Sequence, residues 1–428
     1  MKSYKKLALA GAAVLATVTL AACSSGSTTS SSSSTSAKDV SGNITLWVDT
    51  TQVTYVKPVV TAFEKEYPNV KVTVTQSPTG SSNAKTDVSK DPTKAADVFE
   101  LPNDQLGQMA QAKYINPLTT EQQSAVKANS TDVAVKGVTQ GSQMYGYPFA
   151  EQAKILFYNK SVLSASDIKT FNGLTAKGPL ALTITDTQNG GQYTMVPNFI
   201  SNGVKLYGSD GQDLNGSTFN TKEGEQVMSW IAGLKSNKNV IDASTAAIGD
   251  LKSGKAAAYF DGPWDSASIS KALGSNFAVA TYPTVDYGSG TKQMQSFVGI
   301  EAFAVNSSSK SQAASAALAT YLTSKDTQLN TWWKEQGQIP VSKDAQTSAK
   351  TVASVAIGDA TTSALVLDAT TKQVNFSTLM PALPEMANMW NLSGPLIVGA
   401  YNGKITSSQF SSQLSTFNTN IAKSTSSK

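Results

Sequence analysis

Polar side chains that could hold a ligand gather in four short segments of the sequence. These segments span residues 49–52, 101–105, 148–153 and 261–265, and we predict that they are loops. Their polar and aromatic members are Asp49, Thr51, Asp104, Glu151, Gln152, Asp261, Trp264 and Asp265. Carboxylates accept hydrogen bonds from hydroxyl groups, amides fix direction, and aromatic faces stack on the apolar face of a sugar. The combination favours a neutral, polyhydroxylated ligand, although polar loop residues can also be merely solvated.

The composition excludes several kinds of catalysis. The chain has no histidine, and its 34 basic residues are all lysine. A Ser-His-Asp triad and a histidine metal site are therefore impossible, and the bidentate anion recognition that arginine provides is missing. The GxxxxGK[ST] phosphate loop, the EF-hand and the GxSxG nucleophile elbow do not occur. We expect no catalytic residue, no cofactor and no metal, while a carboxylate pair of the glycosidase kind stays open.

The only cysteine, Cys23, ends a predicted secretion signal. Residues 1–22 begin with a lysine-rich stretch, and the apolar run that follows has about 14 residues, too few to span a bilayer comfortably. Residues 20–23 read Leu-Ala-Ala-Cys, which resembles a bacterial lipobox. That pattern implies a lipidated cysteine as the first mature residue. The alternatives are an ordinary signal peptide with a stray cysteine, or a membrane anchor.

Residues 23–41 are dominated by serine and threonine. Such a segment buries too little apolar surface to fold, so we predict a flexible tether with a reach of roughly 20 Å. The protein would then be lipid-anchored on the extracellular face of the bacterial cell membrane. Three of the 34 basic residues lie in the predicted signal, and the remainder nearly balance the 30 acidic residues. This near-neutral balance argues against a nucleic-acid partner.

Alternating strand and helix patterns predict an α/β fold. Residues 44–48, 70–75 and 97–101 are rich in apolar and β-branched side chains, and a helical pattern between the first two ends at Pro68. Further predicted strands, and an alanine-rich helix, occupy residues 153–159, 181–185, 256–260, 277–282, 302–305 and 312–322. We expect mostly parallel sheets, with ligands beyond the carboxyl ends of the strands.

Several stretches, taken in order, carry a family resemblance. The chain resembles the extracellular solute-binding proteins of ABC importers, in the branch typified by maltose-binding protein. The resemblance covers about residues 42–425. It rests on residues 44–47, 63–68, 96–98, 111–118, 145–150, 156–160, 254–257, 261–264, 282–284, 297–299 and 380–386, followed by Trp390.

The resemblance implies a two-lobed periplasmic-binding-protein-like fold of type II. Each lobe would be a mostly parallel sheet flanked by helices, with the ligand cleft at the hinge. Residues 42–150 and 302–345 would form the N-lobe, and residues 151–301 and 346–425 the C-lobe. A ligand would draw the two lobes together only through its preference for the closed arrangement.

The resemblance also implies a set of ligand-binding residues. By position, Trp264 matches an aromatic that stacks on sugar, and Trp390 with Met380 matches another part of the same wall. Asp49 and Asp104 match polar contacts of the N-lobe, and Tyr193 falls near an aromatic of the C-lobe. With the polar residues of the 148–153 segment added, the predicted set is Asp49, Asp104, Glu151, Gln152, Tyr193, Trp264, Met380 and Trp390.

The chain departs from the maltose-binding pattern at several of these places. Thr51 and Gln52 replace an Asp-Lys pair, Leu101 replaces an aromatic, and Gln105 replaces an arginine beside the matched aspartate. Gln152 stands where the pattern has a glutamate, with Glu151 next to it. Maltodextrin is therefore the leading ligand, while another α-glucoside or an oligosaccharide of different linkage stays open.

These observations predict a substrate-binding lipoprotein of an ABC transporter rather than an enzyme. Its partners would be a maltose or maltodextrin-type oligosaccharide, the permease subunits, and the membrane through the N-terminal lipid. A receptor for a different solute is one alternative. A surface glycosidase, which would hydrolyse the bound oligosaccharide, and an adhesin with a degenerate cleft are the others.

Overall fold

The structure is a computed structural model that describes residues 39–187 and 190–424. The predicted signal at 1–22, Cys23 and most of the predicted tether lie outside the described residues. Among the described residues, none of the helices combines the length and the apolar character that crossing a membrane requires.

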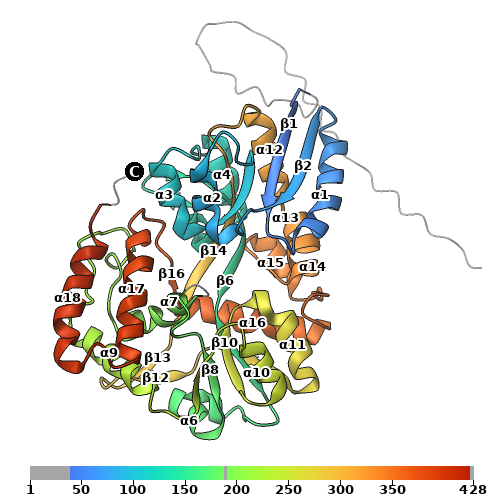
Figure 1. The fold of residues 1–428 in the computed structure, drawn as a ribbon. Coiled ribbons are helices and arrows are strands. Elements are labelled where there is room, and N and C mark those ends of the chain that lie inside the picture. The colour runs from blue at the N-terminus through green and yellow to red at the C-terminus, as the bar shows by residue number, and fades with distance from the viewer. Residues whose placement is uncertain (1–38, 188–189, 425–428) are drawn as a thin grey trace, which may run out of the picture. The chain divides into compact units, whose positions relative to one another are not determined.

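The first of two main sheets in the described ranges has seven strands (Figure 1). Its order is β15–β6–β14–β3–β1–β2, and β16 pairs with β14. Apolar side chains at alternate positions of β1, namely Ile44, Leu46 and Val48, are buried because successive strand residues face opposite sides. The strands are β1 (Gly42–Val48), β2 (Val70–Gln76), β3 (Val98–Pro102), β6 (Tyr147–Ala153), β14 (Phe297–Val305), β15 (Ile339–Pro340) and β16 (Thr378–Leu379).

The second sheet has five strands in the order β11–β7–β10–β8–β9. These strands are β7 (Ile155–Asn159), β8 (Leu180–Leu182), β9 (Val240–Asp242), β10 (Ala258–Asp261) and β11 (Phe277–Ala280). Two small hairpins pair β4 (Thr139–Gln140) with β5 (Gln143–Met144), and β12 (Thr284–Asp286) with β13 (Thr291–Gln293).

Both sheets are mixed, whereas the sequence predicted mostly parallel sheets. In the first sheet, β1 runs parallel to β2 and β3, but β14 runs antiparallel to β3 and β6. In the second sheet, β8 runs parallel to β9 and β10, but β7 runs antiparallel to β10 and β11. A local hydrophobic pattern marks a strand without giving its direction, so this feature had no signal in the sequence.

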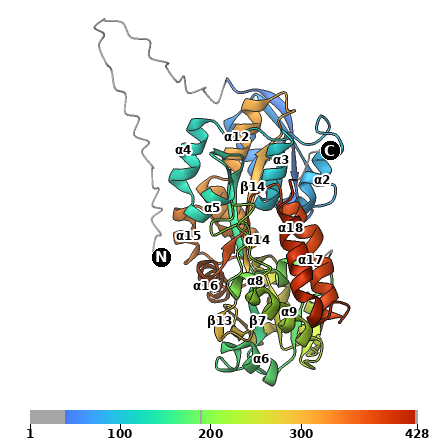
Figure 2. The same cartoon turned by 90° about the vertical axis from the view of Figure 1, so that its left-hand side faces the viewer.

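Helices pack on both sheets. Helix α1 (Val53–Glu66) buries Val56, Val59, Val60 and Phe63 and ends just before Pro68, where the sequence predicted the end. It contacts β2 and α12 (Gln312–Leu322). Around the second sheet, α17 (Met386–Tyr401) lies against α9 (Lys222–Leu234) and α18 (Phe410–Ile421), as Figure 2 shows. The α/β class predicted from the sequence is confirmed.

Shorter helices complete the described fold. They are α2 (Ala84–Lys90), α3 (Leu106–Gln111), α4 (Thr120–Asn129), α5 (Asp132–Gly137), α6 (Phe171–Lys177), α7 (Gly191–Met195), α8 (Pro197–Ser201), α10 (Ala247–Ser253), α11 (Ser266–Leu273), α13 (Lys325–Thr327), α14 (Lys334–Gln336) and α15 (Lys343–Ala349), together with the longer α16 (Ala360–Phe376).

The predicted lobe boundaries fall inside two long strands. The division at 150/151 lies within β6, and the division at 301/302 lies within β14; both strands belong to the first sheet. After β6 the chain passes through Lys154 directly into β7 of the second sheet. The structure has the strand β6 where the sequence predicted a loop at 148–153. The loop was predicted because the polar residues Glu151 and Gln152 interrupt the apolar pattern of the strand. The lobe assignment of individual residues stays a prediction.

Candidate ligand-binding cavity

A cavity of about 980 Å³ is lined by elements of both sheets. The first sheet contributes residues from β6 and β14 and from the turn that follows β3. The second sheet contributes the end of β10, and the helices α7 and α17 supply further lining residues. The carboxyl ends of β3 and β10 both reach the cavity, as expected for ligand sites of α/β sheets.

Most of the predicted ligand-binding residues meet in this cavity. Those that line it are Asp104, Gln152, Tyr193, Trp264, Met380 and Trp390. Asp49 and Glu151 are not among its lining residues. Residues far apart in the sequence are therefore brought together, from position 104 to position 390.

Trp264 lies in a short 3-10 turn, Pro263–Asp265, directly after β10. Its side chain is 36% exposed, which is unusual for a large aromatic residue and leaves the indole available for stacking. The ring folds back over Gly262, where a Cβ atom would lie 2.2 Å from the indole carbons. Glycine at 262 is thus required for this orientation of Trp264.

Tyr193 brings the aromatic residues of the cavity together. Its ring centroid lies 6.3 Å from that of Trp264 and 6.4 Å from that of Trp390. The Tyr193 hydroxyl donates a hydrogen bond to the carbonyl of Phe297 at the start of β14, at 3.3 Å. This bond fixes the ring of an α7 residue against a strand of the first sheet, so the three aromatic rings form one continuous surface.

Asp104 and Trp390 connect opposite parts of the cavity. The indole Nε1 of Trp390 donates to Asp104 Oδ2 at 2.8 Å. Burial raises the pKa of Asp104, and this hydrogen bond acts in the opposite direction. Next to them, the Asn103 amide donates to the carbonyl of Met380 at 2.7 Å, and its oxygen accepts from the backbone N–H of Ile300 at 3.0 Å. The turn after β3 is therefore held firmly against the 380 segment.

Asp49 acts one layer behind the cavity. Its carboxylate accepts from the backbone N–H of Ser81 at 2.6 Å and from the Ser81 hydroxyl at 2.9 Å. Ser81 itself lines the cavity, together with Ser82 and Asn83. Asp49 therefore orients a lining residue rather than facing the cavity.

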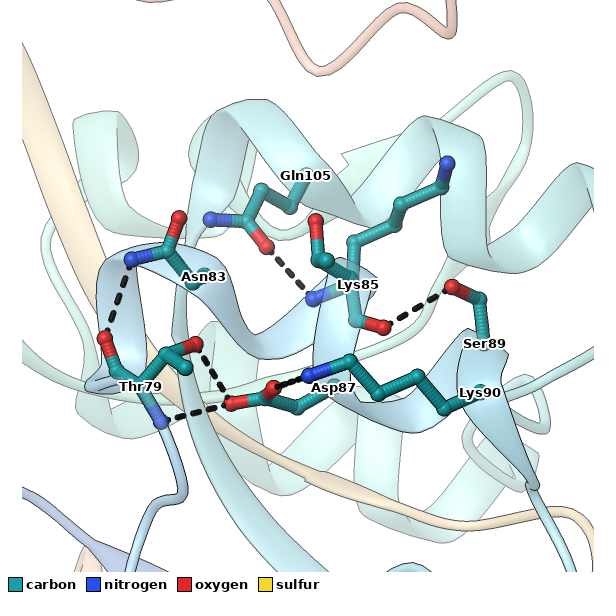
Figure 3. Close-up of polar contacts among 8 residues, drawn as sticks. Thr79, Asn83, Lys85, Asp87, Ser89, Lys90 and Gln105 are labelled. Carbon is teal, nitrogen blue, oxygen red and sulfur yellow. Dashed lines mark hydrogen bonds and ion pairs between the residues drawn. The ribbon is translucent and has the colours of Figure 1, made fainter. Parts of the chain in front are cut away.

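The segment that carries these serines is fastened by side chains shown in Figure 3. Asp87 accepts from the backbone N–H and the hydroxyl of Thr79, at 2.9 and 2.7 Å, and pairs with Lys90 at 2.8 Å. Gln105 accepts from the backbone N–H of Lys85 at 2.7 Å. Gln105, which replaces an arginine of the family pattern, thus combines a place in the cavity lining with a structural bond.

Strand alternation separates Glu151 from Gln152. Gln152 lines the cavity, whereas Glu151 points the other way, is 2% exposed and accepts from the Gln346 amide at 3.0 Å. Burial raises the pKa of Glu151 to about 7. The sequence pattern left both residues open because the phase of the strand was unknown.

Two further departures from the family pattern lie outside the lining. Leu101 is fully buried in the core of the first sheet. Gln52 is buried, and its amide donates to Glu100 Oε1 at 3.1 Å. Neither side chain is placed to contact a ligand directly.

Several lining residues were absent from the predicted set. They are Lys154, Tyr259, Asp261, Asp265, Gln192 and Glu301, among others. Asp261 and Asp265 belonged to a segment that the sequence had singled out. Lys154 and Glu301 gave no signal, because each adjoins or interrupts an apolar strand and resembles a solvent-facing residue.

A pair of buried carboxyl groups lies behind and beside the first-sheet wall. Burial, followed by the charge of Asp49, raises the pKa of Glu100 to about 8. Burial and the neighbouring charge of Glu100 hold the pKa of Glu301 well above its usual range. Glu100 Oε2 and Glu301 Oε2 are both buried and have no hydrogen-bond partner. Ionising both carboxyl groups would place two negative charges close together in a buried environment, which is unfavourable. This pair therefore retains a proton near neutral pH.

The arrangement suits binding by hydrogen bonds and stacking. Aromatic rings, carboxyl groups, amides and one ammonium surround a cavity large enough for several sugar rings. Among the described residues, no three histidine, cysteine, aspartate or glutamate side chains are grouped to hold a metal ion. The fold and cavity are those of a two-lobed ligand-binding protein.

The sequence matches the family of bacterial extracellular solute-binding proteins over residues 59–358, and the chain belongs to this family. A solved structure of the maltodextrin-binding protein of L. casei BL23, without ligand, is 52% identical and has a TM-score of 0.81. The match covers 90% of this chain and all of that one. The likeness confirms the two-lobed fold predicted from the sequence.

Two curated relatives match over nearly the whole chain. One is a galactooligosaccharide-binding protein of Bacillus subtilis, 25% identical, with 94% of each chain covered. The other is a maltooligosaccharide ABC transporter solute-binding lipoprotein of Streptococcus pneumoniae, 24% identical, again with 94% of each chain covered. The family resemblance drawn from the sequence is thereby confirmed.

Proposed function

We propose that this protein is the substrate-binding lipoprotein of an ABC importer and that it binds maltodextrin-type oligosaccharides. The observation that carries the proposal is the wall that Tyr193, Trp264 and Trp390 form beside carboxyl and amide groups in one cavity. The aromatic faces would stack on sugar rings, and the polar groups would bind the ring hydroxyls. The names of the 52% identical structure and of the Streptococcus pneumoniae relative support this ligand class.

Each predicted residue has a role in this proposal. Trp264, Tyr193 and Trp390 supply stacking surface, and Met380 fills the wall beside them. Asp104, with one carboxylate oxygen engaged by Trp390, offers the other to a sugar hydroxyl, and Gln152 contributes an amide. Asp49 and Glu151 serve indirectly: Asp49 through Ser81, and Glu151 through its bond to Gln346.

The proposal extends to the location of the protein. Residues 1–22 would be removed, and lipidated Cys23 would hold the protein on the outer face of the cell membrane. Two acyl chains suffice for stable anchoring. A tether with a reach of roughly 20 Å would keep the cavity near the permease and raise its effective concentration there. The permease subunits would receive the ligand-loaded form.

We further propose that the protein leaves its ligand unchanged. Its family consists of solute-binding proteins. The surface glycosidase is the rival, since carboxyl groups line the cavity. Incubation with maltotetraose and analysis of the recovered sugar separates the two: intact tetrasaccharide supports the binding protein, and shorter products support the glycosidase.

A second candidate ligand is a galactooligosaccharide. The Bacillus subtilis relative is a galactooligosaccharide-binding protein, and its identity to this chain, 25%, is close to the 24% of the Streptococcus pneumoniae relative. The replacements at the family's polar positions, such as Gln152, leave room for this change of specificity. Transport function would be the same, and only the sugar would differ.

A thermal-shift screen tests the proposal. The chain from Ser24 onward would be mixed with maltose, maltotetraose, galactooligosaccharides and peptides. A ligand that binds only the native state raises the unfolding temperature in a saturable manner. We expect saturable stabilisation by maltodextrins and none by peptides. No shift with any saccharide would contradict the proposal and favour an adhesin.

A further inference from the structure

One part of the cavity wall has a charge arrangement that the family resemblance did not supply. Lys154, between β6 and β7, faces Asp261 at the end of β10, and Asp265 lies one turn further on. All three line the cavity. The side chains of Lys154 and Asp261 are only 6% and 4% exposed, so this is a built group rather than a surface ion pair.

The hydrogen bonds within this group are incomplete. Lys154 Nζ donates to Thr194 Oγ1 at 3.1 Å and lies 3.6 Å from Asp261 Oδ1. Asp261 Oδ1 also accepts from the backbone N–H of Gly262 at 2.9 Å, but Asp261 Oδ2 is buried without a partner. An ammonium has three N–H groups, and the hydrogen bond to Thr194 and the ion pair with Asp261 engage at most two of them. One acceptor and one donor thus remain side by side.

A buried carboxylate oxygen without a donor is costly, so Asp261 Oδ2 favours a ligand that brings an O–H group. Asp265 adds a group that can both donate and accept. Burial and the adjacent Asp261 raise the pKa of Asp265 to about 7, while Lys154 and Trp264 act to lower it. Near neutral pH, Asp265 therefore offers either a carboxylate oxygen or an O–H.

Aromatic surface adjoins these polar groups. Trp264 lies between Pro263 and Asp265, and the Tyr193 ring centroid is 5.9 Å from Lys154 Nζ. A sugar ring stacked on the indole projects its hydroxyls outward from the ring edge. Neighbouring hydroxyls on that edge each carry a donor and an acceptor, which matches the incomplete set of Lys154 and Asp261.

We propose that Lys154, Asp261 and Asp265 form a subsite that binds two neighbouring hydroxyl groups of the sugar unit stacked on Trp264. The subsite determines which sugar epimer the protein accepts. Inverting the configuration at one ring carbon moves its hydroxyl group away from Lys154 and Asp261. The inference rests on the proposed oligosaccharide function and names the residues that select among oligosaccharides. A site built to hydrogen-bond a hydroxyl strongly rejects an analogue that does not supply it.

Calorimetric titration of the chain from Ser24 onward tests the subsite. Two neutral ligands of equal length, maltotetraose and a galactotetraose, would be titrated into the wild type, Lys154→Met and Asp261→Asn. The readout is the ratio of the two dissociation constants. We expect the favoured sugar to bind about 10-fold to 100-fold more weakly in each variant, and the ratio to move toward one.

Two further variants keep the result interpretable. Lys255→Met is the matched control, because Lys255 also pairs with an aspartate, Asp250, at 3.2 Å but does not line the cavity. It should leave the ratio unchanged. Asp265→Asn, at a less buried position, tests the subsite if either of the first two variants unfolds, and it should also move the ratio toward one.

The outcomes separate the two levels of the proposal. If the wild type binds a tetrasaccharide and all folded subsite variants keep its ratio, the subsite is overturned while the proposed function stands. If the wild type binds neither sugar, the proposed function fails, and the subsite fails with it.

Discussion

The cavity has two walls that bury charge in different ways. On the first-sheet wall, burial and the charges of Glu100, Asp49 and Asp104, all acidic, raise the pKa of Glu301. On the second-sheet wall, the carboxylate of Asp261 has Lys154 at 3.6 Å. A nearby cation favours the charged form of a carboxyl group, and nearby acidic charges favour its neutral form. The two walls thus differ in the charges that lie beside their carboxyl groups.

The aromatic residues, like Lys154, are distributed unequally between the two walls of the cavity. Tyr193 and Trp264 come from α7 and the turn after β10, and Trp390 comes from α17, which packs on α9 and α18. The first-sheet wall contributes hydroxyl, amide and carboxyl groups. In the proposed function, one wall stacks on the sugar rings and the other binds their hydroxyls.

The largest expected effect comes from removing the exposed stacking surface. Trp264→Ala should weaken oligosaccharide binding by about 2–3 kcal/mol, because most of the contact area of the indole is lost. The fold should persist, since the side chain is 36% exposed. Titration calorimetry and thermal unfolding measure the two effects, with Trp264→Phe as an intermediate case. Unchanged affinity in Trp264→Ala would place the sugar elsewhere.

Replacing Glu100, behind the first-sheet wall, should give a gain in stability that depends on pH. The pKa of Glu100 is raised in the folded protein to about 8, so its burial weakens the folded state progressively as pH rises from the unfolded value toward 8. Glu100→Gln removes this loss and can still accept from Gln52. We expect a gain of about 1–2 kcal/mol in the free energy of unfolding at pH 8 and a small one at pH 5.

Urea unfolding at both pH values measures this gain. The control is Glu66→Gln, at an exposed position of α1, which should change the free energy of unfolding little at either pH. An equal gain from Glu100→Gln at pH 5 and pH 8 would show that Glu100 is ionised throughout.

The hydrogen bond from Trp390 to Asp104 should contribute less to the free energy of unfolding than the change at Glu100. Trp390→Phe keeps an aromatic ring but removes the donor to Asp104, and should lower the free energy of unfolding without ligand by about 1 kcal/mol. Lost ring area adds to this change, so a double-mutant cycle with Asp104→Ala isolates the hydrogen bond. Fully additive effects of the two substitutions would mean that the bond contributes nothing.

A substitution on the second-sheet wall should change the free energy of unfolding with pH by the smallest amount. The pKa of Asp265 is raised to about 7, with Lys154 acting against the shift, and the group is partly accessible to solvent. By the same sign argument, Asp265→Asn should stabilise more at pH 8 than at pH 5, but by only about 0.5 kcal/mol. A gain equal to that of Glu100→Gln would remove the distinction between the walls.

The sequence predicted part of each wall and missed part of each. Trp264 could be found because it follows Gly-Pro at the end of a strand pattern, and Asp104 because it follows β3. Lys154 and Glu301 could not, since an isolated charge beside or within an apolar strand is indistinguishable from a solvent-facing residue. Their burial depends on pairing between β6, β14 and β3, strands distant in sequence.

Other differences also arise from contacts that only the tertiary fold creates. The sequence placed Asp49 in the predicted site, but Ser81 stands between it and the cavity, and no pattern in the sequence links residues 49 and 81. The choice between Glu151 and Gln152 needed the phase of β6. That strand was itself predicted as a loop, because its two polar residues face environments that only the tertiary fold creates.

The proposed function requires that this cavity binds an oligosaccharide and releases it unchanged. The most direct test is calorimetric titration of the chain from Ser24 onward with maltotetraose, followed by analysis of the recovered sugar. We expect saturable binding at one site and recovery of intact tetrasaccharide. Absence of binding to maltotetraose and to every other oligosaccharide tested, or recovery of shortened products, would contradict it.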